Sequence, residues 1–328
     1  GVPIPIKDLY DVAGWVTGYG SLGVTDDPAT LDELVVERLR RAGFVLMGKT
    51  TTPEFGSVSA TECRRTGITR NPWNTDRTPG GSSGGAAAAV ASGMAPIGHA
   101  SDGGGSIRIP ASCTGLVGLK PSHGRIPHPD VDPSETACYG ALTTTVSDSA
   151  RHLDVTAGPH DTDRLSLPPP PMRYEDAIDA LDVSGLRVGW SADLGFAPVD
   201  AEVAEVSRAA AHDAAAAAGV ELVDVDVKLT DPVATWLSAG AMSLWLSIME
   251  HEHWPDRADD LTPYVRTALE ATYDRWKARD PHLADVLLVL GWTGMRWGED
   301  GAHTVCHLRA LYRSERGQWD AFWSVPPN

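Results

Sequence analysis

The chain has 328 residues, of which 42% are hydrophobic and 22% are charged, and its formal net charge at pH 7 is -17. This composition is typical of a globular protein and allows one large or two ordinary domains. The acidic balance argues against a nucleic-acid partner, because binding to phosphates needs clustered Lys and Arg. The four cysteines, Cys63, Cys113, Cys138 and Cys306, include no CxxC pair. We therefore expect reduced thiols in a cytoplasmic protein.

The first half of the chain alternates predicted strands and helices. Residues 1–8 form an extended segment or strand, since their two prolines exclude a helix. Apolar spacing predicts a helix over residues 30–42, and a continuous apolar run predicts a buried strand over residues 44–47. Further elements are expected as a helix at 84–92, short strands at 95–98 and 115–119, and a helix at 148–157. This alternation favours an α/β architecture.

Residues 18–23 match the pattern G-x-G-x-x-G of dinucleotide-binding proteins. That fingerprint needs a helix to begin within the motif, whereas Thr25-Asp26-Asp27-Pro28 follows here and is typical of a turn. We therefore interpret residues 18–23 as a surface loop without a cofactor.

Four consecutive prolines within residues 167–172 separate the first half from the second. We divide the chain into residues 1–165 and residues 166–328. The second half continues with a strand at 185–190, a helix at 200–218 closed by Gly219, and a strand at 220–227. This order suggests that the second half extends the same sheet. After Asp231 the chain becomes helical and holds most of the eleven tryptophans, which we assign to core packing or to a substrate pocket.

Two features of the second half suggest other functions and are discounted. The uncharged run 232–249 is short for a membrane span and has acidic flanks, so we expect a buried helix and no membrane partner. His251 with His253, and His303 with His307, lack a completing ligand at a recognisable spacing, so we expect no metal site.

Two serine clusters set in glycine dominate the first half. Ser82 and Ser83 lie between the glycine pairs of residues 80–85, and Ser106 follows Gly103-Gly104-Gly105. Glycine at this density raises the entropy cost of folding, so packing alone does not explain it. A loop whose backbone amides must approach a ligand closely does explain it.

The order of these motifs resembles the amidase signature family. Its G-G-S-S-G-G box is similar to residues 80–85, its D-x-G-G-S-[IV]-R box to 102–108, and its G-L-K-P box to 118–121. Its upstream G-x-P-x-x-x-K-D box is similar to residues 1–8. The resemblance covers roughly residues 1–165. It implies an α/β fold with a central mixed β-sheet covered by helices on both faces and a more helical C-terminal half.

The same resemblance implies a catalytic triad. Carried over motif by motif, Ser106 is the nucleophile, Ser82 is a bridging serine after a cis peptide bond, and Lys7 is the base. Lysine acts as a base only when neutral, and burial lowers its pKa. No histidine lies in either serine box.

The family also implies roles for the residues around the triad. The backbone amides of Gly103, Gly104, Gly105 and Ser106 are expected to form the oxyanion hole. Asp102 and Arg108 are expected to form a structural ion pair. Ser83 is expected to make a hydrogen bond within its own loop.

The implied function is amide hydrolysis. We expect a cofactor-independent enzyme that cleaves a non-peptide C–N bond of a small-molecule amide through an acyl-enzyme, and a homodimer stays open. One alternative is a glutamine-hydrolysing A subunit of a tRNA-dependent amidotransferase, but those proteins usually have Thr where this chain has Gly103. Another is an inactive truncated chain, because the family normally begins before the lysine box and continues further.

Overall fold

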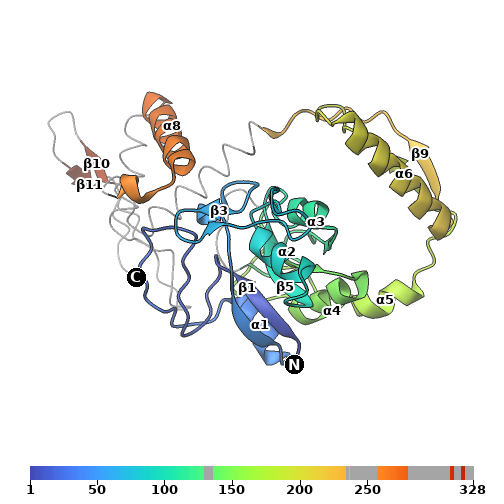
Figure 1. Cartoon of the computed structure of the whole chain (residues 1–328), viewed down its shortest axis with the longest axis horizontal. Helices are drawn as coiled ribbons and strands as arrows, with labels where there is room; N and C mark the ends of the chain where they lie inside the picture. The colour runs from blue at the N-terminus through green and yellow to red at the C-terminus, as the bar shows by residue number, and fades with distance from the viewer. Residues whose placement is uncertain (129–135, 234–235, 237–256, 280–310, 314–318, 322–328) are drawn as a thin grey trace. The chain divides into compact units, whose positions relative to one another are not determined.

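The computed structural model describes residues 1–128, 136–233, 236, 257–279, 311–313 and 319–321 (Figure 1). It divides into one unit of Gly1–Tyr174 with the described residues after 239, and a second unit of Glu175–Ser238. All the predicted catalytic residues belong to the first unit.

Two parallel strands start the first unit. β1 (Pro3–Lys7) pairs with β2 (Val45–Thr50), which places Lys7 opposite Thr50, and α1 (Leu34–Arg41) connects them. The predicted strand at 1–8 is confirmed. The helix begins later than predicted, because Asp32 accepts a hydrogen bond from the Ala13 N–H and holds the entry segment outside the helix.

The prediction of a strand buried on both faces at 44–47 is wrong. Val45 and Met47 are about half exposed, with 54% and 48% of their surface accessible. Alternate side chains of a strand point to opposite faces, and the described elements leave the face that carries Val45 and Met47 open to solvent.

A second group of strands lies beside β1. β5 (Ile97–Asp102), β7 (Cys138–Thr143) and β6 (Val117–Gly118) form an antiparallel sheet in the order β5-β7-β6, and β1 packs alongside β5. The predicted strand at 95–98 stops too early, since β5 continues to Asp102. Parallel and antiparallel strands together make this a mixed α/β fold.

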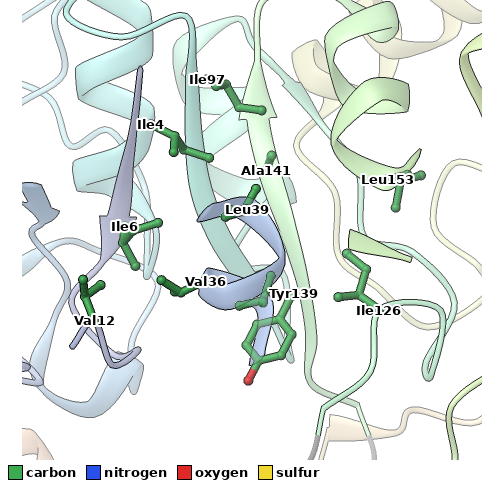
Figure 2. Close-up of a cluster of buried hydrophobic side chains, with 11 residues drawn as sticks. Ile4, Ile6, Val12, Val36, Leu39, Ile97, Ile126, Tyr139, Ala141 and Leu153 are labelled. Atoms are coloured by element: carbon green, nitrogen blue, oxygen red, sulfur yellow. The ribbon is translucent and has the colours of Figure 1, made fainter. Parts of the chain in front are cut away.

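Helices cover these strands through two buried clusters. One cluster packs Ile4 and Ile6 of β1 against Val36 and Leu39 of α1, with Tyr139 of β7 at its edge (Figure 2). Burying one such aliphatic side chain contributes about 1.5–3 kcal/mol, so β1 is firmly held before it reaches Lys7.

The other cluster is built from small side chains. α2 (Gly84–Ala91) and α3 (Arg108–Thr114) pack Ala86, Ala87 and Ala111 against Ala100 and Leu142. α4 (Val146–Thr156) begins at the Thr145 cap and packs on the first cluster through Leu153. The helices predicted at 84–92 and 148–157 are confirmed. α3 and β7 were not predicted, since their sequences lack a clear apolar period.

The G-x-G-x-x-G segment is a loop, but it is not a surface loop. Gly18, Gly20, Ser21 and Gly23 are buried. The Arg65 guanidinium closes over the segment and donates a 3.0 Å hydrogen bond to the Ser21 carbonyl. Three short elements follow, namely η1 (Glu54–Gly56), β3 (Glu62–Cys63) and β4 (Gly67–Ile68).

The second unit matches the predicted order of elements. α5 (Tyr174–Ala180) leads to β8 (Arg187–Trp190), α6 (Ala201–Ala218) and β9 (Glu221–Asp224), and β8 and β9 are parallel. Gly219 has a φ of 67° and ends α6, as predicted. Among the described strands β8 pairs only with β9, so the joining of the two halves into one sheet stays a prediction.

The remaining described elements are η2 (Ala258–Asp260), α8 (Pro263–Arg279) and the antiparallel strands β10 (Leu311–Arg313) and β11 (Trp319–Ala321). The predicted helix at 232–249 and the two histidine pairs lie outside the described residues, apart from residues 232, 233 and 236.

No helix in the described segments is long and apolar enough to cross a membrane. The same segments contain no group of three or more potential metal-ligating side chains. Cys63, Cys113 and Cys138 form no disulfide there.

Candidate active site

The structure brings Lys7 and Ser82 into direct contact. Lys7 ends β1 and is 1% exposed, and its Nζ donates a 2.7 Å hydrogen bond to Ser82 Oγ. The same nitrogen donates a 3.1 Å hydrogen bond to Ser101 Oγ on the adjacent strand β5. The amine that the sequence assigns as a base is therefore aimed at the serine assigned as its relay.

Backbone geometry places Ser82 in this position. The peptide bond between Gly81 and Ser82 is cis, as the resemblance implied. A side chain at Gly81 would place its Cβ 2.8 Å from the backbone of Ala60, so only glycine fits there. Thr61 Oγ1 donates to the Gly80 carbonyl at 2.9 Å and accepts from the Gly84 N–H at 3.1 Å, which fixes the loop on both sides of the serines.

Burial changes the protonation of Lys7. It lowers the pKa of this amine from 10.5 to about 7, because the ammonium loses its hydration, and the Asp102 carboxylate opposes this shift to a smaller extent. Near neutral pH a substantial fraction of Lys7 is therefore uncharged and has a lone pair available to accept a proton.

A second lysine, the half-buried Lys49 on β2, offers a comparison. Its Nζ donates to the Tyr10 carbonyl at 2.6 Å and to Thr17 Oγ1 at 2.9 Å, and it forms an ion pair with Asp8 at 3.5 Å. Burial lowers the pKa of Lys49, but the charge of Asp8 opposes this. In the described part of the chain Lys7 donates hydrogen bonds to hydroxyl groups only. Lys49, in contrast, forms an ion pair with a carboxylate and anchors the loop that follows β1.

Asp102 organises the loop before Ser106. Its carboxylate accepts hydrogen bonds from Arg108 Nε at 3.0 Å and Arg108 Nη2 at 2.9 Å, from the Gly105 N–H at 2.7 Å and from the Ile107 N–H at 3.1 Å. The expected ion pair of Asp102 and Arg108 is present. Burial alone would raise the pKa of Asp102, but these hydrogen bonds, with Arg108 first, lower it to about 2.

The backbone amides of this loop are not equivalent. The Gly105 N–H already donates to Asp102, and Gly105 has a φ of 112°, which favours glycine. Within the described part of the chain the N–H groups of Gly104 and Ser106 donate to no acceptor. Gly104 is exposed and Ser106 is half-buried, so both amides can reach a substrate.

Ser106 is connected to the serine loop through its backbone. The Ser83 N–H donates a 3.2 Å hydrogen bond to the Ser106 carbonyl, which ties the two clusters together. The Ser106 hydroxyl makes no hydrogen bond to the described residues. No hydrogen bond between Ser106 Oγ and Ser82 Oγ is formed among the described residues, so this part of the relay stays a prediction.

The sequence missed one partner of the triad, Ser101, and predicted the wrong hydrogen-bond partner for Ser83. Ser101, the second partner of Lys7, was missed because the predicted strand ended at Gly98, four residues before the end of β5. Extending the strand to Asp102 would have placed Ser101 beside β1. Ser83 was expected to bond within its own loop, but its Oγ donates to the Ser101 carbonyl at 3.2 Å, because β5 lies against the serine loop.

Comparisons with known proteins identify the family of the chain. A sequence-family model described as Amidase matches residues 1–280. An acylamidase of Rhodococcus erythropolis is 42% identical over 250 residues, which is 76% of this chain and 50% of that protein. The chain therefore spans about half the length of the curated relatives it matches.

Solved structures give the same result for the fold. A bacterial aryl acylamidase of the amidase signature family superposes with a TM-score of 0.77 and 28% identity, over 89% of this chain and 63% of that chain. The A subunit of a glutamyl-tRNA(Gln) amidotransferase from Thermotoga maritima superposes with a TM-score of 0.65 and 27% identity, over 85% of this chain and 66% of that chain.

Proposed function

The chain belongs to the amidase family, and from that premise we propose that it hydrolyses a non-peptide amide through an acyl-enzyme on Ser106. The single observation that carries the proposal is the hydrogen bond from Lys7 Nζ to Ser82 Oγ, 2.7 Å long and buried. Serine is a weak nucleophile until a base removes its proton. A lysine whose pKa burial lowers to about 7 can supply that base near neutral pH.

The proposed reaction begins with proton transfer. Ser106 Oγ attacks the amide carbon and gives its proton to Ser82 Oγ, while Ser82 gives its own proton to neutral Lys7. The carbonyl oxygen becomes an oxyanion in a tetrahedral intermediate. Ser106 has lost one proton, Ser82 has exchanged one for another, and Lys7 has gained one and is now an ammonium.

The second half of acylation reverses the relay. The C–N bond breaks, and the leaving nitrogen takes a proton from Lys7 through Ser82, which releases the amine and leaves an ester on Ser106. A water molecule then attacks this ester, again losing its proton toward Lys7. The bond from the acyl carbon to Ser106 Oγ then breaks, and Ser106 Oγ takes back the proton from Lys7 through Ser82. The carboxylic acid is released, Ser106 regains its hydroxyl and Lys7 is neutral again.

Stabilisation of the oxyanion is assigned to the backbone of residues 103–106. The N–H groups of Gly104 and Ser106 are the best supported donors, since Gly105 already donates to Asp102. Removing one oxyanion donor in other hydrolases raises the barrier by roughly 3 kcal/mol, so this loop matters as much as the base. By analogy with the acylamidase and aryl acylamidase to which the chain is similar, we propose a small acyl or aryl amide as substrate.

A fluorophosphonate probe tests the proposal without a known substrate. The intact chain is incubated with the probe and digested, and the labelled peptide is mapped by mass spectrometry. We expect label on Ser106, and its loss in Ser106→Ala and in Lys7→Ala. The exposed Ser112 of α3 supplies a control, since Ser112→Ala should label normally. Normal labelling of Lys7→Ala would overturn the mechanism.

The alternatives make different predictions. A glutamine-hydrolysing subunit would release ammonia from glutamine and respond to partner subunits or to tRNA, whereas the proposed enzyme turns over simple aryl or acyl amides alone. An inactive chain would leave Ser106 unlabelled while still unfolding cooperatively. Parallel assays of glutamine and an aryl amide therefore separate the three functions.

A further inference from the structure

The carboxylate of Glu54 is buried and forms no ion pair with the described residues. Glu54 is 1% exposed and begins η1. Its Oε2 accepts two hydrogen bonds from Thr262, from the backbone N–H at 2.7 Å and from Oγ1 at 2.6 Å. Burying a carboxylate without such donors costs free energy. The two hydrogen bonds from Thr262 therefore stabilise Glu54 in the interior, although the two residues are 208 positions apart.

Thr262 immediately precedes α8, which starts at Pro263. The free N–H groups at a helix start favour a negative charge, and proline suits the first helical position. Leu261, Val265 and Leu269 are each at most 3% exposed, so the first turns of α8 are packed into the first unit. Glu54 therefore receives the N-terminus of a docked helix.

Two arginines hold the segment before α8 in the same place. Arg64, directly after β3, donates from Nη1 to the Asp259 carbonyl at 2.9 Å. Arg257 Nη1 donates to the Gly23 carbonyl at 2.5 Å. The Arg257 contact joins this segment to the loop of residues 18–23, and that loop contacts Asp8 directly after β1, where the Gly18 N–H donates to the Asp8 carboxylate at 3.1 Å.

The element that Glu54 begins touches the relay serine. A Cβ built on Gly56, two residues after Glu54, would lie 3.3 Å from Ser82 Oγ, so the backbone of η1 is directly against that hydroxyl. The turn is tight, with Phe55 at a φ of 51° and Gly56 at 66°. A residue such as phenylalanine adopts this conformation only when its surroundings impose it.

The same turn is tied to the segment that carries Lys7. The Phe55 N–H donates to the Tyr19 carbonyl at 2.8 Å, and the two rings stack with centroids 6.0 Å apart. The Tyr19 N–H in turn donates to the carbonyl of Asp8 at 3.1 Å, next to Lys7. One continuous set of contacts therefore runs from α8 through Glu54 to both members of the Lys7–Ser82 hydrogen bond.

We propose that Glu54 is a positioning residue: by holding the start of α8, it presses η1 against Ser82 and keeps the Ser82 hydroxyl aligned with Lys7. This proposal rests on the proposed function only for its catalytic readout. Its structural readout is independent of activity.

The test uses the whole chain with Glu54→Ala, Glu54→Gln and Thr262→Val. The Gln variant keeps one oxygen that can accept both hydrogen bonds, and the Val variant removes one donor with little change of shape. The matched control is Thr145→Val, which removes the side-chain cap of α4, where Thr145 Oγ1 accepts from the Asp148 N–H at 3.1 Å. Each variant is studied by hydrogen exchange with mass spectrometry and by the rate of fluorophosphonate labelling at Ser106.

We expect Glu54→Ala to speed exchange in peptides covering residues 53–57 and 80–85 and to slow labelling roughly tenfold, as loss of hydrogen bonds to a buried charge predicts. Thr262→Val should show a smaller effect in the same peptides, and it decides the question if Glu54→Ala does not fold. Glu54→Gln should stay within about threefold of the unsubstituted chain. Thr145→Val should change exchange in α4 alone.

The proposal is overturned if Glu54→Ala and Thr262→Val loosen α8 while exchange at residues 80–85 stays unchanged. It is also overturned if all the variants, the control included, slow labelling equally, since that would indicate general instability. Failure of the unsubstituted chain to label at Ser106 would count against the hydrolase alone, because the exchange measurement still decides the role of Glu54.

Discussion

Lys7 Nζ and Ser82 Oγ lie 2.7 Å apart, although 75 residues separate them in the chain. The contact depends on two unrelated local features, the apolar strand β1 that ends in Lys7 and the glycine loop that turns Ser82 toward it. Neither a strand nor a loop alone would create a base. Because the two features meet in the buried interior, the fold lowers the pKa of Lys7, and this pKa can be measured.

The first prediction concerns the pH dependence of labelling at Ser106. Burial lowers the pKa of Lys7 to about 7, and only the neutral amine can accept the serine proton. The labelling rate should therefore rise as pH increases through about 7 and level off above it. Rates measured between pH 5 and 9 check this, in a range where the chain remains folded by circular dichroism. A rise centred near 10 would show that Lys7 keeps its ordinary pKa.

The second prediction concerns stability. The pKa of Lys7 is lower in the folded chain than the 10.5 of an exposed lysine, so the unfolded chain binds more protons between about 7 and 10.5. The free energy of unfolding therefore increases with pH across this window, and below it Lys7 destabilises the fold by roughly 4–5 kcal/mol. Lys7→Met should abolish labelling and raise the melting temperature at pH 6, because it removes a buried charge and keeps a similar volume.

Matched substitution of the second lysine checks that interpretation. Lys49 pairs with Asp8, so Lys49→Met leaves a buried carboxylate without its cation and should lower the melting temperature. Equal destabilisation by both substitutions would contradict the assignment of different roles to the two lysines.

The third prediction tests Ser101, which the sequence did not reveal. Its hydroxyl accepts a hydrogen bond from Lys7, and this contact favours the charged amine. Ser101→Ala should therefore move the midpoint of the pH profile of labelling to lower pH. It should also slow labelling at high pH by about tenfold, since Lys7 loses one of the two contacts that orient it. Ser101→Thr keeps a hydroxyl and is the control, and an unchanged midpoint in Ser101→Ala would exclude this role.

The sequence predicted those parts of the site that are encoded in contiguous motifs. The family resemblance that these motifs carry implied the cis peptide bond before Ser82 and the ion pair of Asp102 with Arg108, and the structure contains both. The role of Ser101 depends on where β5 ends, and a run of small polar residues gives no periodic signal for that. The contact of Glu54 with Thr262 joins residues 208 positions apart, and no local pattern specifies it.

Burial was the other property that the sequence could not supply. Residues 18–23 are rich in glycine and were expected at the surface, yet Arg65 closes over them. Likewise, the apolar run at 44–47 does not reveal that the described elements leave one face of β2 open to solvent. Both errors arise because exposure depends on which distant segment covers a residue, and not on the residue itself.

The fourth prediction concerns Asp102. Its pKa of about 2 in the folded chain lies below the 3.8 of an unfolded aspartate, so its ionised form stabilises the fold above about pH 4. That contribution, about 2 kcal/mol, should disappear as pH falls from about 4 toward 2. Asp102→Asn should lower the free energy of unfolding at pH 7 and remove this dependence. It should also weaken the hydrogen bond from the Gly105 N–H and so slow labelling at Ser106. Denaturant titrations measure the change in stability, and the probe assay measures the labelling rate.

The fifth prediction concerns two histidines that share no role in the proposed reaction. His99 and His152 are fully buried, and burial lowers the pKa of His152 from 6.5 to about 4 and that of His99 well below its ordinary value. Neither ring nitrogen of His99 has a hydrogen-bond partner among the described residues, which favours the neutral form. Each imidazole is therefore harder to protonate in the folded chain than in the unfolded chain.

The unfolded chain then binds more protons below pH 6.5, so the free energy of unfolding should fall as pH decreases from 6.5 to 4. His152 alone should account for about 3 kcal/mol of this loss. His152→Leu removes the group and should flatten the stability profile in that range, even if its packing lowers the stability at pH 8. Urea titrations of both chains at pH 8, 6 and 4.5 measure the difference. Parallel profiles for the two chains would show that His152 is already protonated or exposed, and that the acid sensitivity has another origin.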